Sequence, residues 1–115
     1  MGRRRTGAPR AVPGAHLRFE DVIRRQLDLF EEDCADLIEE CDAAERAYDA
    51  ADRDEAEEKY GDYLDLVETG TDRLVELRDG FARTMVEDAA EAYEAEFNQA
   101  VQARLPRFAL GIENA

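Results

Sequence analysis

Cys34 and Cys41 are the residues whose type and spacing are most open to a chemical role. On one helix, seven residues separate their Cα atoms by about 10 Å, too far for a mutual disulfide. Without a second cysteine pair or a nearby histidine they do not form a standard zinc site, and their acidic neighbours disfavour a thiolate nucleophile. We interpret both as buried small hydrophobic residues in a reducing compartment, with a bridge to a second copy as the alternative.

The other residues suited to acid–base or metal chemistry are paired glutamates and one histidine. Glu31-Glu32 and Glu39-Glu40 are expected mainly on the outward face of a helix, and His16 precedes the helical region. A carboxylate-bridged di-iron site would need Glu-x-x-His on facing helices, and no glycine-rich phosphate loop is present. We therefore expect no catalytic residue, no metal and no cofactor, and the chain is predicted not to be an enzyme.

The elements that position these residues are helices, because apolar residues recur at alternating spacings of four and three. This heptad seam predicts a helix over residues 20–51 that packs along other helices. Its members are Ile23, Leu27, Phe30, Cys34, Leu37, Cys41, Ala44, Tyr48 and Ala51.

The seam breaks after residue 51, where the apolar face rotates by about 120° around a helix axis. A turn at 51–54 would accommodate this change, with Asp52 as N-cap and Glu55 completing a capping box. The alternative is one continuous helix over 20–68. The new apolar set, which predicts a helix over 54–68, is Ala56, Tyr60, Tyr63, Leu64 and Val67.

A second turn is predicted at Thr69-Gly70-Thr71, since Gly70 can end a helix and Thr71 can cap the next, over 72–104. This third helix has two apolar sets about 120° apart, and so needs two packing partners or one that changes side. The first set is Leu74, Leu77, Phe81 and Met85; the second is Val86, Tyr93, Phe97 and Val101.

The fold class is predicted to be all-α, an elongated antiparallel helical bundle of three helices or a long two-helix hairpin. At 1.5 Å per residue the middle helix would be about 24 Å long and the outer two about 46 to 50 Å. About half of each long helix would then lack cover, which favours self-assembly or a larger complex.

Both termini differ from the helical region. Residues 1–18 carry five arginines and no acid among glycine and proline, which predicts a disordered basic arm. After Pro106, the residues Phe108, Leu110 and Ile112 alternate, so 105–115 is predicted to be an extended apolar docking tail. A tail that folds back onto the bundle is the alternative.

The formal net charge of −14 predicts repulsion from nucleic acid and anionic membranes. No apolar stretch is long enough for a membrane span, and we expect a cytoplasmic protein. No motif identifies a known family.

The predicted function is a non-catalytic assembly or adaptor subunit, with a protein partner, copies of itself, or both. The alternatives are an acidic inhibitor or antitoxin-like protein that mimics nucleic acid, and an accessory subunit of a multi-subunit enzyme. The predicted interface residues are Leu27, Phe30, Cys34, Leu37, Cys41, Val86, Tyr93, Phe97, Val101, Phe108, Leu110 and Ile112.

Overall fold

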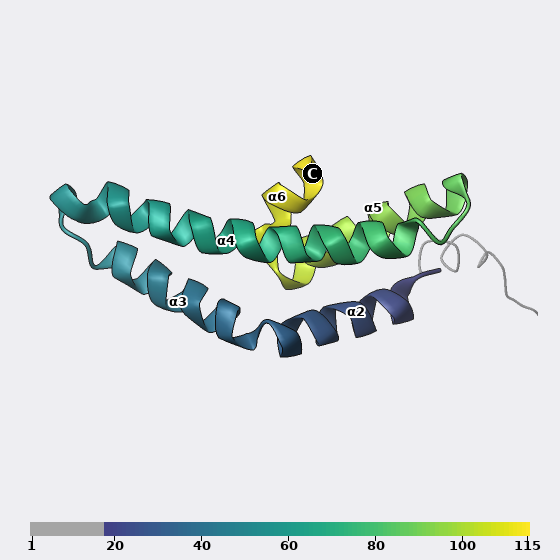
Figure 1. Cartoon of the computed structure of the whole chain (residues 1–115), viewed down its shortest axis with the longest axis horizontal. Coiled ribbons are helices and arrows are strands. Elements are labelled where there is room, and N and C mark those ends of the chain that lie inside the picture. Colours follow the sequence, from purple (N-terminus) through teal and green to yellow (C-terminus); the bar gives the residue numbers. More distant parts are fainter. Residues whose placement is uncertain (1–17) are drawn as a thin grey trace, which may run out of the picture.

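The structure, a computed structural model, describes residues 18–115, which form an elongated helical unit of 67 × 32 × 24 Å (Figure 1). No strand occurs in this range, so the predicted all-α class is confirmed. The predicted basic arm lies outside the described residues apart from Arg18. The elements are α2 (Glu20–Asp33), α3 (Ala35–Asp49), α4 (Arg53–Ala82), α5 (Glu87–Arg104), the 3-10 helix η2 (Pro106–Phe108) and α6 (Ala109–Asn114).

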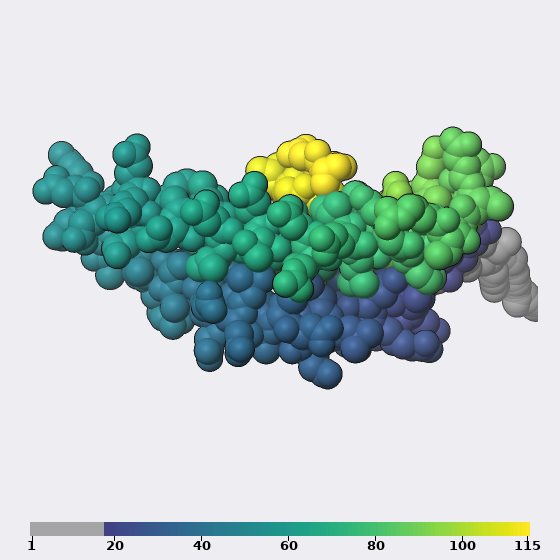
Figure 2. Space-filling model, in the orientation of Figure 1, coloured from purple at the N-terminus to yellow at the C-terminus, as the bar shows by residue number. Residues whose placement is uncertain are grey.

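The long helix α4 is the element against which the others pack. Its C-terminal half contacts α2 and α5, while α3 lies along its N-terminal half (Figure 1). The space-filling view shows α6 as a protrusion over the middle of α4 (Figure 2). The molecule therefore has a three-helix half and a two-helix half. The two-helix half, residues 35–70, is called the acidic hairpin below.

The turn predicted at 51–54 is confirmed, because α3 ends at Asp49 and α4 begins at Arg53. The alternative of a continuous helix over 20–68 is wrong. Asp52 is the N-cap residue of α4, with extended φ and ψ of −70° and 162°, but its side chain makes no capping hydrogen bond. The predicted capping box is therefore not formed.

The predicted helix over 20–51 changes direction at Cys34, which separates α2 from α3. The φ and ψ angles of Cys34 are −109° and 24°, outside the helical range. Backbone bonds from Cys34 N to Phe30 O (2.8 Å) and from Ile38 N to Cys34 O (2.9 Å) continue across this point. The change is thus a kink, and no proline or glycine marks it in the sequence.

The turn predicted at Thr69-Gly70-Thr71 is wrong, because α4 is continuous from Arg53 to Ala82. The hydroxyl groups of both threonines donate to backbone oxygens four residues earlier, Thr69 to Asp65 (3.1 Å) and Thr71 to Val67 (2.9 Å). Such bonds satisfy a threonine side chain inside a helix. The structural role of Gly70 is close packing with Phe108 and not helix termination.

A turn over residues 83–86 divides the predicted third helix into the end of α4 and α5. The hydroxyl of Thr84 donates to Phe81 O (2.7 Å), and Val86 takes the extended N-cap conformation before α5. Glu87 and Asp88 follow in the first turn, where acidic groups stabilise a helix dipole. The two apolar sets of the predicted helix consequently fall largely on two helices, each facing the core.

The extended conformation predicted for 105–115 is wrong, and the alternative that the tail folds back is confirmed. The segment forms η2 and α6, which pack against α4 and α5. Phe108 and Ile112 are four residues apart, so on helical backbone they share a face, and both are buried. Leu110 points away from this face and is 74% exposed.

Candidate functional site

Most of the predicted interface residues belong to the chain's own core. Nine are buried, Leu37 is partly buried against them, and two are largely exposed. Val86 is 76% exposed in the turn before α5 and Leu110 is 74% exposed on α6. The seam joins α2 and α3 to the rest of the bundle, as predicted. The buried nine are Leu27, Phe30, Cys34, Cys41, Tyr93, Phe97, Val101, Phe108 and Ile112.

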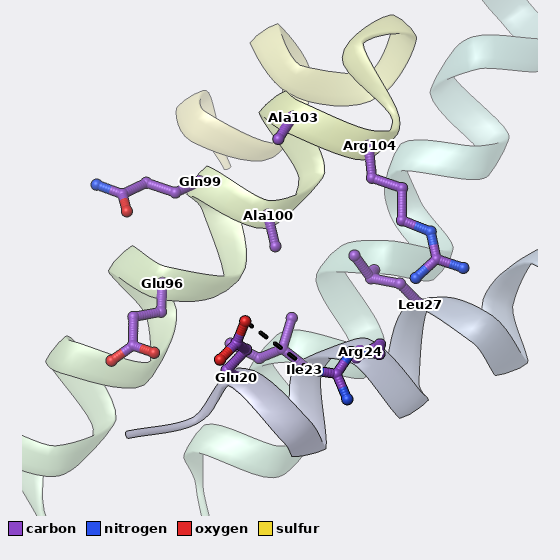
Figure 3. Close-up of a pocket in the computed structure, with 9 residues that line it drawn as sticks. All are labelled: Glu20, Ile23, Arg24, Leu27, Glu96, Gln99, Ala100, Ala103 and Arg104. Atoms are coloured by element: carbon purple, nitrogen blue, oxygen red, sulfur yellow. Dashed lines mark ion pairs between the residues drawn. The ribbon is translucent and has the colours of Figure 1, made fainter. Parts of the chain in front are cut away.

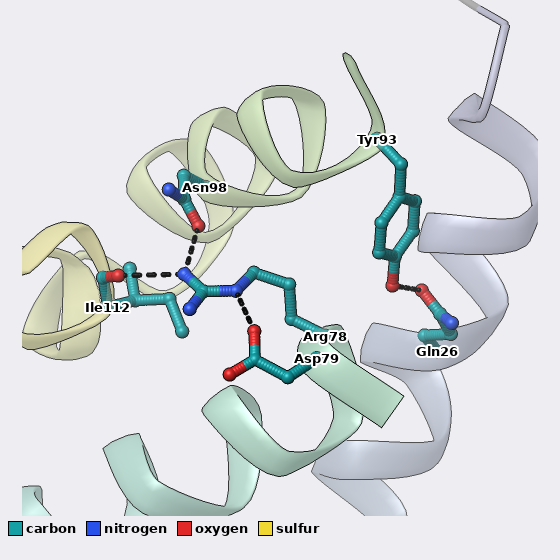
Figure 4. A network of polar contacts seen from close by, with 6 residues as sticks. All are labelled: Gln26, Arg78, Asp79, Tyr93, Asn98 and Ile112. Carbon is teal, nitrogen blue, oxygen red and sulfur yellow. Dashed lines mark hydrogen bonds and ion pairs between the residues drawn. The ribbon is translucent and has the colours of Figure 1, made fainter. Parts of the chain in front are cut away.

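A polar network inside the three-helix half holds the C-terminal helix in place (Figure 4). The Nη1 group of the buried Arg78 donates to Ile112 O (2.9 Å) and to Asn98 Oδ1 (3.0 Å), while its Nε pairs with Asp79 Oδ1 (2.9 Å). Because Ile112 O is near the C-terminal end of α6, the guanidinium also opposes the negative pole of that helix. This network is a structural fastening.

A second buried hydrogen bond joins α5 to α2. The Tyr93 hydroxyl donates to Gln26 Oε1 over 2.8 Å, and both side chains are buried (Figure 4). Burial raises the pKa of Tyr93 to about 12, since the phenolate would lose its hydration. A neutral phenol of this kind is a hydrogen-bond donor, and here its partner is the Gln26 side chain.

Arg107 fastens the tail to the base of the acidic hairpin. Its Nη2 group pairs with Asp42 Oδ1 (2.9 Å) and Glu45 Oε1 (3.0 Å), and its Nε donates to the Tyr63 hydroxyl (3.1 Å). The guanidinium also lies 5.6 Å from the centre of the Tyr63 ring, within the range of a cation–π contact. Both the hydroxyl and the ring of Tyr63 therefore contact the tail.

Beyond these contacts and the buried Cys41, the hairpin has no interior of its own. Among residues 42–69 no side chain is buried, although both helices carry apolar groups there. Tyr48 on α3 is 38% exposed, and Tyr60 and Leu64 on α4 are 45% and 43% exposed. The rings of Tyr48 and Tyr60 are 5.1 Å apart between centroids, so they join the two helices at their surface. These three side chains form an exposed apolar face, which we call the Tyr60 face.

The Tyr60 face lies in the most acidic part of the chain. Residues 35–70 contain fourteen acidic and three basic side chains, a formal net charge of −11. Within residues 18–115, the ion pairs of these acids involve only Asp42 and Glu45, both with Arg107. Most of the hairpin's charge is therefore uncompensated by neighbouring bases in the described part of the chain, and its surface potential is strongly negative.

A shallow groove of about 530 Å³ separates α2 from α5 (Figure 3). Ile23, Leu27 and Ala100 line its apolar part, and the first two are almost completely buried. At its edge Arg104 is held by Asp28 and Glu31, and Arg24 pairs with Asp21 (3.1 Å). Arg24 also pairs with Glu20 (3.8 Å), and Glu96 Oε1 accepts from Phe19 N (3.2 Å), so the charged groups that line the groove already have partners. Gln99 is the other polar side chain in its lining.

Over the part of the chain that the structure describes, no three His, Cys, Asp or Glu side chains converge as metal ligands would, and no helix is both long and apolar enough to cross a bilayer. Comparison of the sequence and the structure with protein families, curated proteins and solved structures found no match.

The exposed apolar side chains of the hairpin were not among the predicted interface residues. Tyr48 was assigned to the seam, and Tyr60 and Leu64 to a short middle helix. The sequence signal that could have indicated them is the predicted difference in helix length, because it leaves part of each long helix uncovered. In the structure α5, with 18 residues, is shorter than the 30-residue α4 and packs against the C-terminal half of α4, which leaves the hairpin half without that cover.

Proposed function

We propose that this chain is a non-catalytic assembly or adaptor subunit whose acidic hairpin docks on a partner protein. The observation that carries the proposal is the absence of any buried side chain over residues 42–69, combined with the exposure of the Tyr60 face. The three-helix half contains nearly all of the core and the polar fastenings, and it is suited to be the rigid base.

The helices of the acidic hairpin are long but poorly covered. Helices in proteins are stabilised mainly by packing of an apolar face, and a two-helix unit offers each helix only one neighbour. Full burial of a Leu or Tyr-sized side chain contributes about 1.5 to 3 kcal/mol, and these three are roughly half exposed. A partner that covers the Tyr60 face therefore gains several such contributions at one place.

A second candidate, an acidic inhibitor that mimics nucleic acid, is favoured by the hairpin's charge of fourteen acids against three bases. The two functions differ in what occupies the partner's site. A mimic competes with duplex DNA or RNA for a basic groove, so an excess of duplex would release the partner. An adaptor that binds through apolar contacts stays bound under that competition.

The test compares two leucine substitutions in the tagged full-length chain, expressed in its source cells. Leu64→Glu places a charge in the Tyr60 face, where Leu64 is 43% exposed, and Leu110→Glu places one on α6, where Leu110 is 74% exposed. We expect the same partner to copurify with the natural chain and with Leu110→Glu, and to be lost with Leu64→Glu. Circular dichroism checks that both variants are folded.

Two results would contradict the proposed function. A partner retained by Leu64→Glu at the natural level contradicts docking through the hairpin. A chain that is monomeric by light scattering at micromolar concentration and copurifies with nothing contradicts the adaptor function as a whole.

A further inference from the structure

Gly61 occupies a mid-helix position in α4 for which the described chain offers no packing reason. A Cβ atom added there would meet no atom within 4 Å. Glycine inside a helix costs about 1 kcal/mol relative to alanine. By contrast, Gly70 in the same helix is explained, because a Cβ atom there would overlap the Phe108 ring.

The position of Gly61 connects it with the Tyr60 face. It directly follows Tyr60 and precedes Leu64 by three residues, so on the helix it lies beside the exposed leucine. A residue without a Cβ atom at this place lets another backbone approach α4 closely. Gly61 and the exposed side chains together resemble one half of a helix crossing whose other half does not occur within residues 18–115.

The charge around this face determines the chemistry of the missing half. Seven acidic residues lie within two turns of Gly61 on α4, and the hairpin as a whole has a net charge of −11. A second hairpin of the same sequence would bring like charges together, which disfavours that contact. A basic partner gains attraction at every flank. The seven acids are Asp54, Glu55, Glu57, Glu58, Asp62, Asp65 and Glu68.

We infer that the Tyr60 face, with Gly61 at the crossing point, binds an amphipathic helix of a partner protein that presents apolar residues flanked by Lys or Arg. This inference rests on the proposed function and specifies its partner. Apolar contacts with Tyr60 and Leu64 supply affinity, and the acidic flanks orient the helix and accelerate its association.

The experiment uses a synthetic helical peptide of Leu, Lys and Ala, with leucines at i, i+3, i+4 and i+7 and one Ala at the intended crossing. Binding to the full-length chain is measured by fluorescence anisotropy at about 50 and 300 mM salt, since screening separates charge attraction from apolar contact. A scrambled peptide of equal charge is the matched ligand. We expect the amphipathic peptide to bind at least about tenfold more tightly, which corresponds to about 1.4 kcal/mol.

Two glycine variants test the crossing point. Gly61→Gln and Gly80→Gln both replace a helical glycine in α4 where an added Cβ atom makes no close contact, the nearest atom at Gly80 being Arg83 Nη2 at 3.9 Å. Both should raise the thermal midpoint, because glutamine is the better helix former. Only Gly61→Gln should weaken peptide binding, by about tenfold or more, because its side chain fills the crossing.

The inference is overturned if both peptides bind equally, or if the two glycine variants bind the amphipathic peptide alike. It is also overturned if the chain's mass doubles with concentration and Gly61→Gln abolishes the dimer, which would make a second copy the occupant. Loss of the inference leaves the proposed function intact if the copurified partner is still lost with Leu64→Glu. If no partner copurifies while the peptide binds as expected, the proposed function is wrong. The inference that the Tyr60 face binds a basic amphipathic helix is then retained.

Discussion

The ring of Phe108 occupies the space into which a side chain at Gly70 would extend. A Cβ atom at Gly70 would lie 2.5 Å from Phe108 Cε1, and the Phe108 ring is buried and cannot move aside freely. Gly111 has the same relation to Thr71, at 2.8 Å from its Cγ2. Two glycines, one on α4 and one on α6, therefore let the tail approach α4 at backbone distance.

We expect Gly70→Ala to lower the free energy of unfolding by about 1 to 3 kcal/mol, because overpacking displaces the Phe108 ring. The sign is informative, since alanine is intrinsically the better helix former by about 1 kcal/mol. Urea denaturation followed by circular dichroism measures the change. Gly61→Ala, in the same helix with no atom within 4 Å, should instead raise stability by about 0.5 to 1 kcal/mol. Equal shifts for both variants would contradict the packing argument.

Arg78→Met should destabilise the chain by about 2 to 3 kcal/mol, because Ile112 O and Asn98 Oδ1 lose their donor while the methionine keeps the apolar stem. Carboxypeptidase digestion should remove α6 faster in this variant than in the natural chain. Arg104→Met is the matched control, since its ion pairs with Asp28 and Glu31 are partly exposed and should contribute about 1 kcal/mol or less. If Arg78→Met lowers the free energy of unfolding no more than Arg104→Met does, the network does not hold the tail.

Helix content and the first turn could be predicted from the sequence because both have a periodic signal. The seam ends at residue 51 and the apolar face rotates, and α4 begins two residues later. The same signal exists between Met85 and Val86, where the apolar face also rotates. The sequence pattern predicts one helix with two packing partners there, whereas the chain makes a turn between α4 and α5. Periodicity detects that the apolar face rotates. It does not distinguish a turn that ends the helix from a continuous helix that meets a second packing partner.

The errors at Gly70 and in the tail have one physical origin. Thr69-Gly70-Thr71 has the residue types of a helix end, but its glycine is needed for contact with Phe108, which is distant in the sequence. Phe108, Leu110 and Ile112 alternate as in a strand, yet Phe108 and Ile112 are also one helical turn apart. The conformation of short segments such as these is determined by tertiary contacts. For the same reason the exposure of Tyr60 and Leu64 could not be predicted, since it depends on which half of α4 is covered by α5.

Cys41 should react with thiol reagents only after the chain opens. Its side chain is fully buried and burial raises its pKa, so both access and thiolate formation are suppressed. In a Cys34→Ala variant, we expect Cys41 to react with Ellman's reagent at pH 8 at least about 100-fold more slowly in the native state than in concentrated urea. A native rate near that of the unfolded chain would mean that the kinked α2 and α3 pair separates readily from α4.

Tyr93 makes stability depend on pH in the alkaline range. Its pKa is about 12 in the folded chain, against about 10 when unfolded, so the folded state favours the neutral phenol. The corresponding stabilisation, of order 2 to 3 kcal/mol, is fully present below pH 10 and is lost as the pH rises from 10 to 12. Tyr93→Phe removes the hydroxyl that donates to Gln26 Oε1. Urea denaturation at pH 9 should therefore show this variant to be less stable than the natural chain. By pH 12 the difference should shrink or reverse, and a constant difference would contradict a buried neutral Tyr93.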